Sequence, residues 1–175
     1  MHVRVVVPCY PIVAHFMSNQ FGNPVKLDMS HPLCKTINAI LSTKKNYRYR
    51  DSETLVNHKS QFVLSLTPKI RKENGHHLSP TRVRELNTII KGYFYDRMFD
   101  HFDMQLFRNP DYVIKDGVLQ YLLHKNIPIE EVQVETVIRA YRRHRKNSPT
   151  AYIKTNWSRR TTQNSHVLSS NKKAS

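Results

Sequence analysis

The sequence has few of the residues and patterns that usually mark an enzyme, a secreted protein or a membrane protein. Only four of its 175 residues are glycine, and no glycine-rich loop of the kind that cradles phosphate is present. Two cysteines, Cys9 and Cys34, are too few for a disulfide framework, so we expect a reducing, cytoplasmic location. We find neither a signal-peptide pattern nor a run of about 20 apolar residues, and we therefore expect no membrane association.

Acidic residues are also scarce relative to basic ones. Thirteen Asp and Glu stand against 28 Lys and Arg, which gives a formal net charge of +15. Residues 135–175 hold ten of the basic residues and a single acid, Glu135, so this quarter of the chain carries +9. A hydrophobic fraction of 39% indicates that most of the chain folds. A folded and strongly basic chain favours a polyanionic partner, nucleic acid more than a membrane surface.

The order of patterns along the chain predicts an α+β fold. The first part alternates β-branched runs with amphipathic segments that proline and glycine interrupt. Strands are predicted at 2–7, 25–28 and 60–66, and helices at 11–21 and from about 30 to 41. We expect the first strand to be buried in a sheet. Residues 1–78 therefore form, in this interpretation, a small β-α-β-α unit with a third strand.

The second part of the chain predicts helices. Ser79-Pro80 is a clear helix start, with serine as N-cap and proline in the first helical position. The apolar stripe that follows continues to about Leu106, with a break or kink expected at Gly92. A second amphipathic helix is predicted at about 113–125. Residues 79–147 then form a helical unit, and residues 148–175, rich in Ser, Thr, Asn and Lys, form a flexible basic tail.

The most informative stretch is Pro128–Lys146, in which apolar and basic residues separate onto two helical faces. The apolar face has the i, i+3, i+4, i+7 spacing of a buried stripe, in Val134, Val137, Ile138 and Tyr141. The basic face repeats that spacing in Arg139, Arg142, Arg143 and Lys146. The two stripes start five residues apart, which places them about 140° apart around the helix. One face is thus expected to pack and the other to offer a row of cations, although a merely solvated surface helix also fits.

This stretch resembles the turn and recognition helix of helix-turn-helix DNA-binding proteins. The resemblance rests on Ile127-Pro128, Val132 and Glu135-Thr136-Val137, leading into Arg139 and Arg142. No glycine or small residue occupies the turn, which leaves open whether 129–133 form a short helix of their own. The resemblance implies two helices joined by a tight turn, the second lying on DNA. The architecture as a whole also looks like accessory DNA-binding proteins of bacterial phages and mobile elements. The DNA-contacting residues implied are Thr136, Arg139, Arg142, Arg143, Arg145 and Lys146, joined by Arg159 and Arg160 of the tail.

A secondary nucleic-acid site is predicted between the second helix and the third strand. In a strand, alternation there would put tyrosines on one face and arginines on the other, for base stacking and phosphate contact together. The residues concerned are Lys44, Lys45, Tyr47, Arg48, Tyr49 and Arg50. As an exposed loop the same segment needs no such role, and the two interpretations carry equal weight.

Two patterns could hold metal ions, but neither forms a convincing site. Asp96, Asp100 and Asp103 would line one helical face and could bind Mg²⁺, yet Arg97 within the row favours ion pairing instead. His31 and Cys34 could supply two zinc ligands, whereas a zinc site needs three or four. We therefore predict no metal, no cofactor and no enzymatic activity.

Our hypothesis is a non-enzymatic protein that binds double-stranded DNA. It would be a helix-turn-helix regulator or a replication accessory factor of a phage or mobile element, and whether it forms a homodimer is left open. The alternative is a structural component of a virion or ribonucleoprotein that binds nucleic acid without sequence preference. Sequence preference separates the two, because a regulator should favour its sites by about 10³ or more over random DNA.

Overall fold

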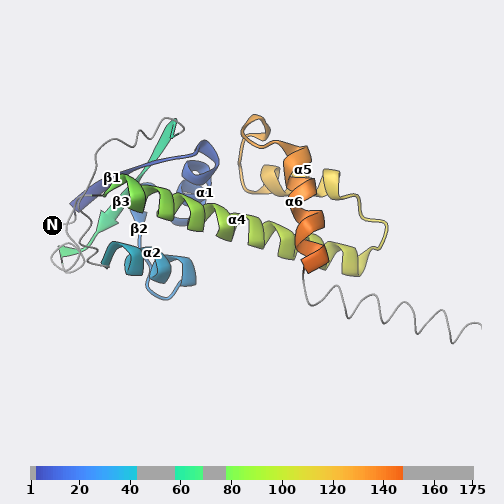
Figure 1. Cartoon of the computed structure of the whole chain (residues 1–175), viewed down its shortest axis with the longest axis horizontal. Coiled ribbons are helices and arrows are strands. Elements are labelled where there is room, and N and C mark those ends of the chain that lie inside the picture. The colour runs from blue at the N-terminus through green and yellow to red at the C-terminus, as the bar shows by residue number, and fades with distance from the viewer. Residues whose placement is uncertain (1–2, 43–57, 69–77, 148–175) are drawn as a thin grey trace, which may run out of the picture. The chain divides into compact units, whose positions relative to one another are not determined.

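The computed structural model describes residues 3–42, 58–68 and 78–147 and has an α+β fold, as predicted. Its strands are β1 (Val3–Cys9), β2 (Val25–Lys26) and β3 (Ser60–Leu66). Its helices are α1 (Pro11–Phe21), α2 (Pro32–Ser42), α4 (Pro80–Arg108), α5 (Ile114–His124), the 3-10 helix η1 (Ile129–Glu131) and α6 (Val134–Asn147). Figure 1 labels these elements along the chain.

The three strands form one small mixed sheet in the order β1-β3-β2. The central strand β3 pairs antiparallel with β1, from Val3 opposite Leu66 to Cys9 opposite Ser60, and parallel with β2. Strand β1 is an edge strand with alternating exposure: Val5 and Val7 are buried, whereas Val6 is half exposed. The prediction that the first strand is buried in the sheet is therefore correct for one face only, because the helices cover one face.

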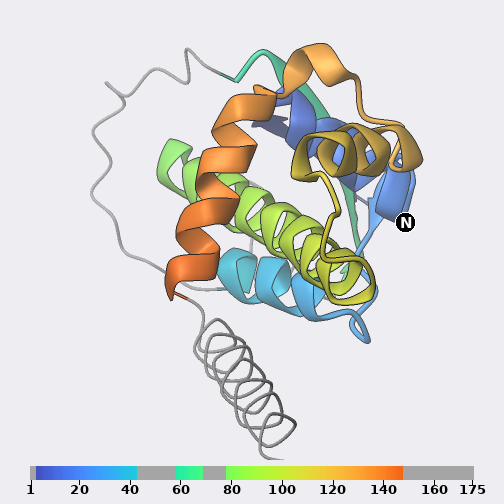
Figure 2. The ribbon, with the colours of Figure 1, turned by 90° about the vertical axis from the view of Figure 1, so that its right-hand side faces the viewer.

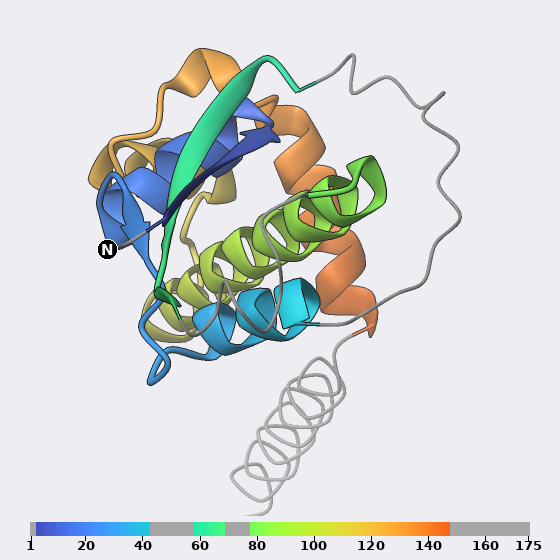
Figure 3. The same cartoon turned by 90° about the vertical axis from the view of Figure 1, so that its left-hand side faces the viewer.

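Helices α1 and α4 lie on the covered face of the sheet. Helix α1 packs on β3, and α4 contacts both α1 and β1. Figure 3 looks onto the strands with α1 behind them, and Figure 2 shows α2 lying along α4. The core between these layers consists of apolar side chains such as Phe16, Met17, Leu64, Phe94 and Met98, all of them buried.

The first two helices match the predictions closely. Helix α1 buries Ile12, Val13 and Phe16, and it ends where Gly22 takes a positive φ of 80°, a conformation that glycine adopts without strain. Helix α2 begins at Pro32, and its predicted apolar stripe is buried. That stripe consists of Leu33, Ile37, Ile40 and Leu41. Local helix signals and the apolar period therefore agree with the packing.

Helix α4 is longer and more regular than predicted. Its N-cap is Ser79, whose side chain accepts a hydrogen bond from the Arg82 backbone N–H at 3.2 Å. The helix then runs for 29 residues to Arg108 without interruption at Gly92. The expected break there is wrong, because the helix continues to bury large apolar side chains after Gly92, including Phe94, Met98 and Phe102. Packing on this scale outweighs the roughly 1 kcal/mol helical cost of a glycine.

The end of α5 is attached to α1. The Asn19 side chain donates hydrogen bonds to the backbone oxygens of Lys125 at 2.7 Å and Asn126 at 3.2 Å. His15 Nε2 lies 3.0 Å from the Glu131 carboxylate, linking α1 to η1 as well. These contacts hold α5 and the following loop beside the N-terminal elements.

The described residues divide into two compact units, one ending at Gln133 and the other beginning at Val134 with α6. The predicted boundaries at 78 and 147 border segments outside the described residues and stay predictions. The predicted tail, 148–175, also lies outside them. Among the described helices, none combines the length and apolar character needed to cross a bilayer.

Candidate nucleic-acid interface and an aromatic pocket

Helix α6 has the two faces that its sequence predicts, except that Val134 of the apolar stripe is only half-buried. The side chains of Val137, Ile138 and Tyr141 are buried, with exposed fractions of 1%, 8% and 2%. Glu135 lies in the first turn, and His144, Arg145 and Lys146 lie in the last. Acidic residues near a helix N-terminus and basic residues near its C-terminus both complement the helix dipole. The charged residues at its two ends and the burial of its apolar face thus both stabilise α6 as a helix.

The opposite face of α6 is cationic. The side chains of Arg139, Arg142, Arg143 and Lys146 are exposed, as is Thr136, while Arg145 is half-buried. Within this face, Arg143 Nε donates a hydrogen bond to the Arg139 backbone oxygen at 3.4 Å, one turn back. Over its 14 residues α6 carries five Lys and Arg against Glu135. It therefore presents a dense row of cations to the solvent along about 11 Å of helix, from Arg139 to Lys146.

The connection between α5 and α6 is longer than the predicted tight turn. Residues 125–133 separate the two helices and include η1, with Pro128 as its N-cap. Helix α6 accordingly begins at Val134 and not at Pro128. Val132 has an extended backbone, with φ −125° and ψ 117°, and its side chain is buried, as is that of Ile127. The periodicity predicts a helix from Pro128 onward, and the interruption of that helix before Val134 accompanies the burial of these two apolar residues.

Several predicted site residues lie outside the described part of the chain. This applies to the secondary site and to the two tail arginines, which stay predictions. The residues are Lys44, Lys45, Tyr47, Arg48, Tyr49, Arg50, Arg159 and Arg160.

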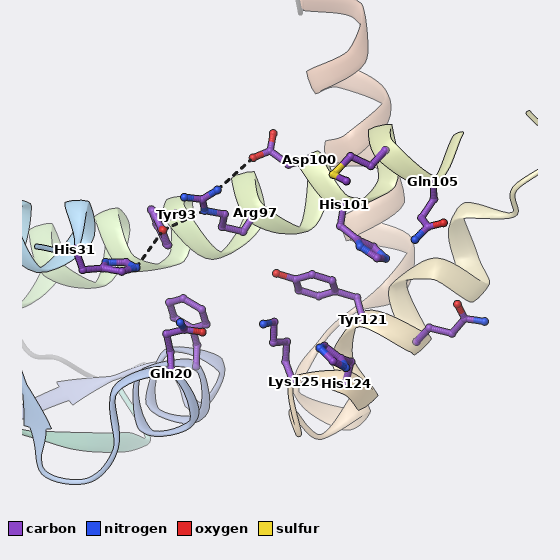
Figure 4. A pocket seen from close by; sticks show the side chains of 13 residues that line it. Gln20, His31, Tyr93, Arg97, Asp100, His101, Gln105, Tyr121, His124 and Lys125 are labelled. Carbon is purple, nitrogen blue, oxygen red and sulfur yellow. Dashed lines mark hydrogen bonds and ion pairs between the residues drawn. The ribbon is translucent and has the colours of Figure 1, made fainter. Parts of the chain in front are cut away.

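A pocket that the sequence interpretation missed lies among α1, α4, α5 and His31, the residue before α2 (Figure 4). Its volume is about 660 Å³. Rings, amides and charged groups line it: Phe16, Gln20, His31, Tyr93, Arg97, Asp100, His101, Met104, Gln105, Gln120, Tyr121, His124 and Lys125. Six of these residues come from α4, and they are separated by one, three or four positions, so they lie along one side of the helix. This second stripe on α4 could have been found in the sequence. The residues of the other helices that face it could not.

One side of the pocket is organised around Arg97. Its Nε donates to the Tyr93 hydroxyl at 3.0 Å, and its guanidinium lies 5.1 Å from the centre of the Tyr93 ring. The same hydroxyl lies 3.5 Å from His31 Nε2, and Arg97 Nη1 lies 4.0 Å from the Asp100 carboxylate. The hydrogen bond to Tyr93 raises the pKa of Arg97, so this side chain keeps its charge. Figure 4 shows the chain of contacts from His31 to Asp100.

The other side is organised around Tyr121, which is buried and projects into the pocket (Figure 4). The centre of its ring lies 5.5 Å from the His101 ring and 6.0 Å from Lys125 Nζ. Burial raises the pKa of the Tyr121 hydroxyl to about 12, so it stays protonated. Burial also lowers the pKa of His101, and the positive charges of His124, Arg108 and Lys125 lower it further. The surroundings of His101 therefore disfavour its protonated form.

The metal patterns do not come together as sites. Asp96 and Asp100 are exposed, Asp103 is half-buried, and within the described residues no group of three potential metal ligands is close enough to bind an ion. Cys34 is buried in α2. Burial raises the pKa of the Cys9 thiol to about 12, which keeps it protonated and a poor nucleophile.

The candidate sites are therefore of two kinds, both defined by charge and geometry. One is the cationic face of α6, formed by Thr136, Arg139, Arg142, Arg143, Arg145 and Lys146. The other is the aromatic pocket, which all lies on residues before 134. Comparison with protein-family models, with curated proteins and with solved structures finds no match for this chain.

Proposed function

We propose that this chain binds double-stranded DNA through the cationic face of α6 and does no chemistry on it. The observation that carries the proposal is the separation within α6 of buried apolar side chains from exposed arginines. A helix of about 10–12 Å diameter fits the major groove, where arginine pairs with guanine and also contacts phosphates. The arginine side chains of α6 are long enough to reach both bases and phosphates, and the buried apolar face holds the helix in place.

The finer part of the proposal is that α5 and α6 act as a helix-turn-helix-like unit. The usual motif joins its two helices by three or four residues, whereas here 125–133 intervene. The proposal therefore depends on α6 as the reading helix and not on the turn. Arg159 and Arg160 of the basic tail would add phosphate contacts that raise affinity without reading bases.

A regulator or replication accessory factor of a phage or mobile element is the role that we propose. Cys9 and Cys34 are both buried free thiols, which supports a reducing cytoplasmic compartment. A structural protein that packages nucleic acid would use the same cations. It would, however, bind all duplexes about equally.

The test begins with selection of binding sites from random duplexes by the full chain. Affinity is then measured on a selected and a scrambled site, at several salt concentrations, for Arg139→Ala, Arg142→Ala and Arg143→Ala. We expect each change to cost about 1–3 kcal/mol where the arginine reads a base, and to reduce the salt slope by about one where it contacts phosphate. A preference of about 10³ or more for selected sites supports a regulator.

The matched control is Arg4→Ala, which removes an exposed arginine from β1. It should leave the affinity for the selected site nearly unchanged, and circular dichroism should show full helix content in every variant. Equal losses for Arg4→Ala and the three α6 variants would show that net charge alone drives binding. Uniform binding to all duplexes would instead indicate the packaging role.

A further inference from the structure

We propose that the aromatic pocket binds a nucleoside phosphate, either a free mononucleotide or the phosphorylated end of a nucleic-acid strand. Its volume of about 660 Å³ lies within the range of pockets that enclose small organic ligands. None of its lining residues lies on α6. This proposal therefore stands apart from the proposed duplex interface, and each can fail without the other.

The rings of the pocket suit the face of a base. Phe16 and Tyr121 line the pocket and are largely buried, and the Phe16 ring also contacts Tyr93, with centroids 6.2 Å apart. Tyr93 lines the pocket as well and is half-buried. Bases stack on such aromatic side chains whatever their identity, because every base has a π face.

The amides suit the edge of a base. Gln20, Gln105 and Gln120 line the pocket from three different helices, α1, α4 and α5. A glutamine side chain offers two donors and one acceptor oxygen. That combination matches the mixed donors and acceptors along a base edge, as glutamine does when it pairs with adenine. A purely hydrophobic ligand would make no use of these three amides.

The cations suit a phosphate. Two permanent cations, Arg97 and Lys125, and three histidines line the pocket, against one carboxylate, that of Asp100. Tyr93 takes the Arg97 Nε donor and Asp100 faces Nη1, while Nη2 makes no hydrogen bond within the described part of the chain. Arginine binds phosphate through such paired N–H groups, and the contact with Tyr93 holds the guanidinium ready at little entropic cost. Asp100 opposes an anion and is expected to weaken binding.

The test uses the full chain and isothermal titration calorimetry with adenosine monophosphate, adenosine and inorganic phosphate. We expect the monophosphate to bind at least tenfold more tightly than either part of it. Arg97→Ala and Lys125→Ala should each weaken its binding about tenfold or more, because both remove a charged partner of the phosphate. Asp100→Asn should tighten it, because this substitution removes the opposing carboxylate. Arg84→Ala removes another exposed arginine of α4 outside the pocket and should change nothing.

Two further ligands distinguish the sources of the nucleotide. A short single strand with a 5′-phosphate is compared with the same strand carrying a 5′-hydroxyl. If strand ends are the ligand, the phosphorylated strand binds more tightly than the mononucleotide, and Arg97→Ala removes the advantage. If the free mononucleotide is the ligand, the two strands bind alike and more weakly than it does.

Three results would overturn the proposal. The first is no binding of the monophosphate or of either strand. The second is equal binding of adenosine and its monophosphate, and the third is unchanged affinity in both Arg97→Ala and Lys125→Ala. The duplex interface is checked separately, since Arg142→Ala should leave mononucleotide affinity unchanged, and Arg97→Ala should leave duplex preference unchanged.

Discussion

Asn87 is a buried polar side chain that joins α4 to the end of β1. Its exposed fraction is 1%. Its Oδ1 accepts from the Tyr10 backbone N–H at 3.2 Å, and its Nδ2 donates to the backbone oxygens of Pro8 at 3.0 Å and Val83 at 2.8 Å. Replacing Asn87 by alanine would leave the Tyr10 N–H and the Pro8 carbonyl without these partners. The carbonyl of Val83 would keep its helical bond from within α4.

The expected loss of stability in Asn87→Ala follows from the two backbone groups that lose their hydrogen-bond partner. A buried backbone group that loses its partner costs about 1–3 kcal/mol, so two cost about 2–6 kcal/mol. Both hydrogen bonds are only partly buried, so water can reach the groups after truncation. We therefore expect a loss of about 2–4 kcal/mol, a large share of the roughly 5–15 kcal/mol by which domains are stable. Asn87→Leu should lose a comparable amount, because its apolar side chain leaves the same two groups unpaired.

The assay is equilibrium unfolding in urea. With a slope of about 2 kcal/mol per molar, the midpoint of Asn87→Ala should fall by about 1–2 M at an unchanged slope. The matched control is Thr88→Ala, the next residue of the same helix, which is exposed and should shift the midpoint little. If both variants unfold at nearly the same urea concentration as the parent, Asn87 does not fasten α4 to β1 as we argue.

Two further predictions concern stability. Leu122→Ala should lower the free energy of unfolding by about 2–5 kcal/mol, because this side chain is fully buried. Leu123→Ala should lower it little, because this side chain is 73% exposed. Equal melting temperatures for the two variants would contradict the packing of α5. Burial lowers the pKa of His101 below its ordinary value of 6.5. As the pH falls, the His101 side chain is therefore protonated in the unfolded chain before it is protonated in the folded chain. The free energy of unfolding should then decrease from about pH 7 down through the lowered pKa. His101→Gln should lose less stability than the parent between pH 7 and pH 5 in urea unfolding, and parallel losses would show that His101 does not carry the dependence.

Much of the secondary structure was predictable because it depends on local signals. Pro11–Phe21 and Ser60–Leu66 have the bounds that the sequence predicts, since a glycine or proline lies near an end of each pattern and the apolar period is unambiguous. The Ser79 cap and the two faces of α6 follow from spacing alone. In each case the signal lies in residues that are neighbours in the sequence.

The errors occur where distant residues compete with local preference. Gly92 does not interrupt α4, because the large side chains beyond it pack into the core. The sequence left open whether 129–133 form a separate short helix, and the structure has a 3-10 helix there, between the buried side chains of Ile127 and Val132, before α6 begins. Asn87 reads in the sequence as an ordinary polar residue of a helix, and only the approach of β1 gives it three hydrogen bonds.

The sequence by itself determined the α+β class, the strongly basic C-terminal part and the amphipathic character of α6, because charge, composition and helical period are properties of neighbouring residues. Only the tertiary structure decided that β3 is the central strand and that Arg97, His101 and Tyr121 meet in one pocket. Those three side chains belong to α4 and α5, and their meeting depends on how the two helices pack around Phe94 and Phe102. Packing of this kind is set by the shapes of side chains far apart in the sequence, which no local period encodes.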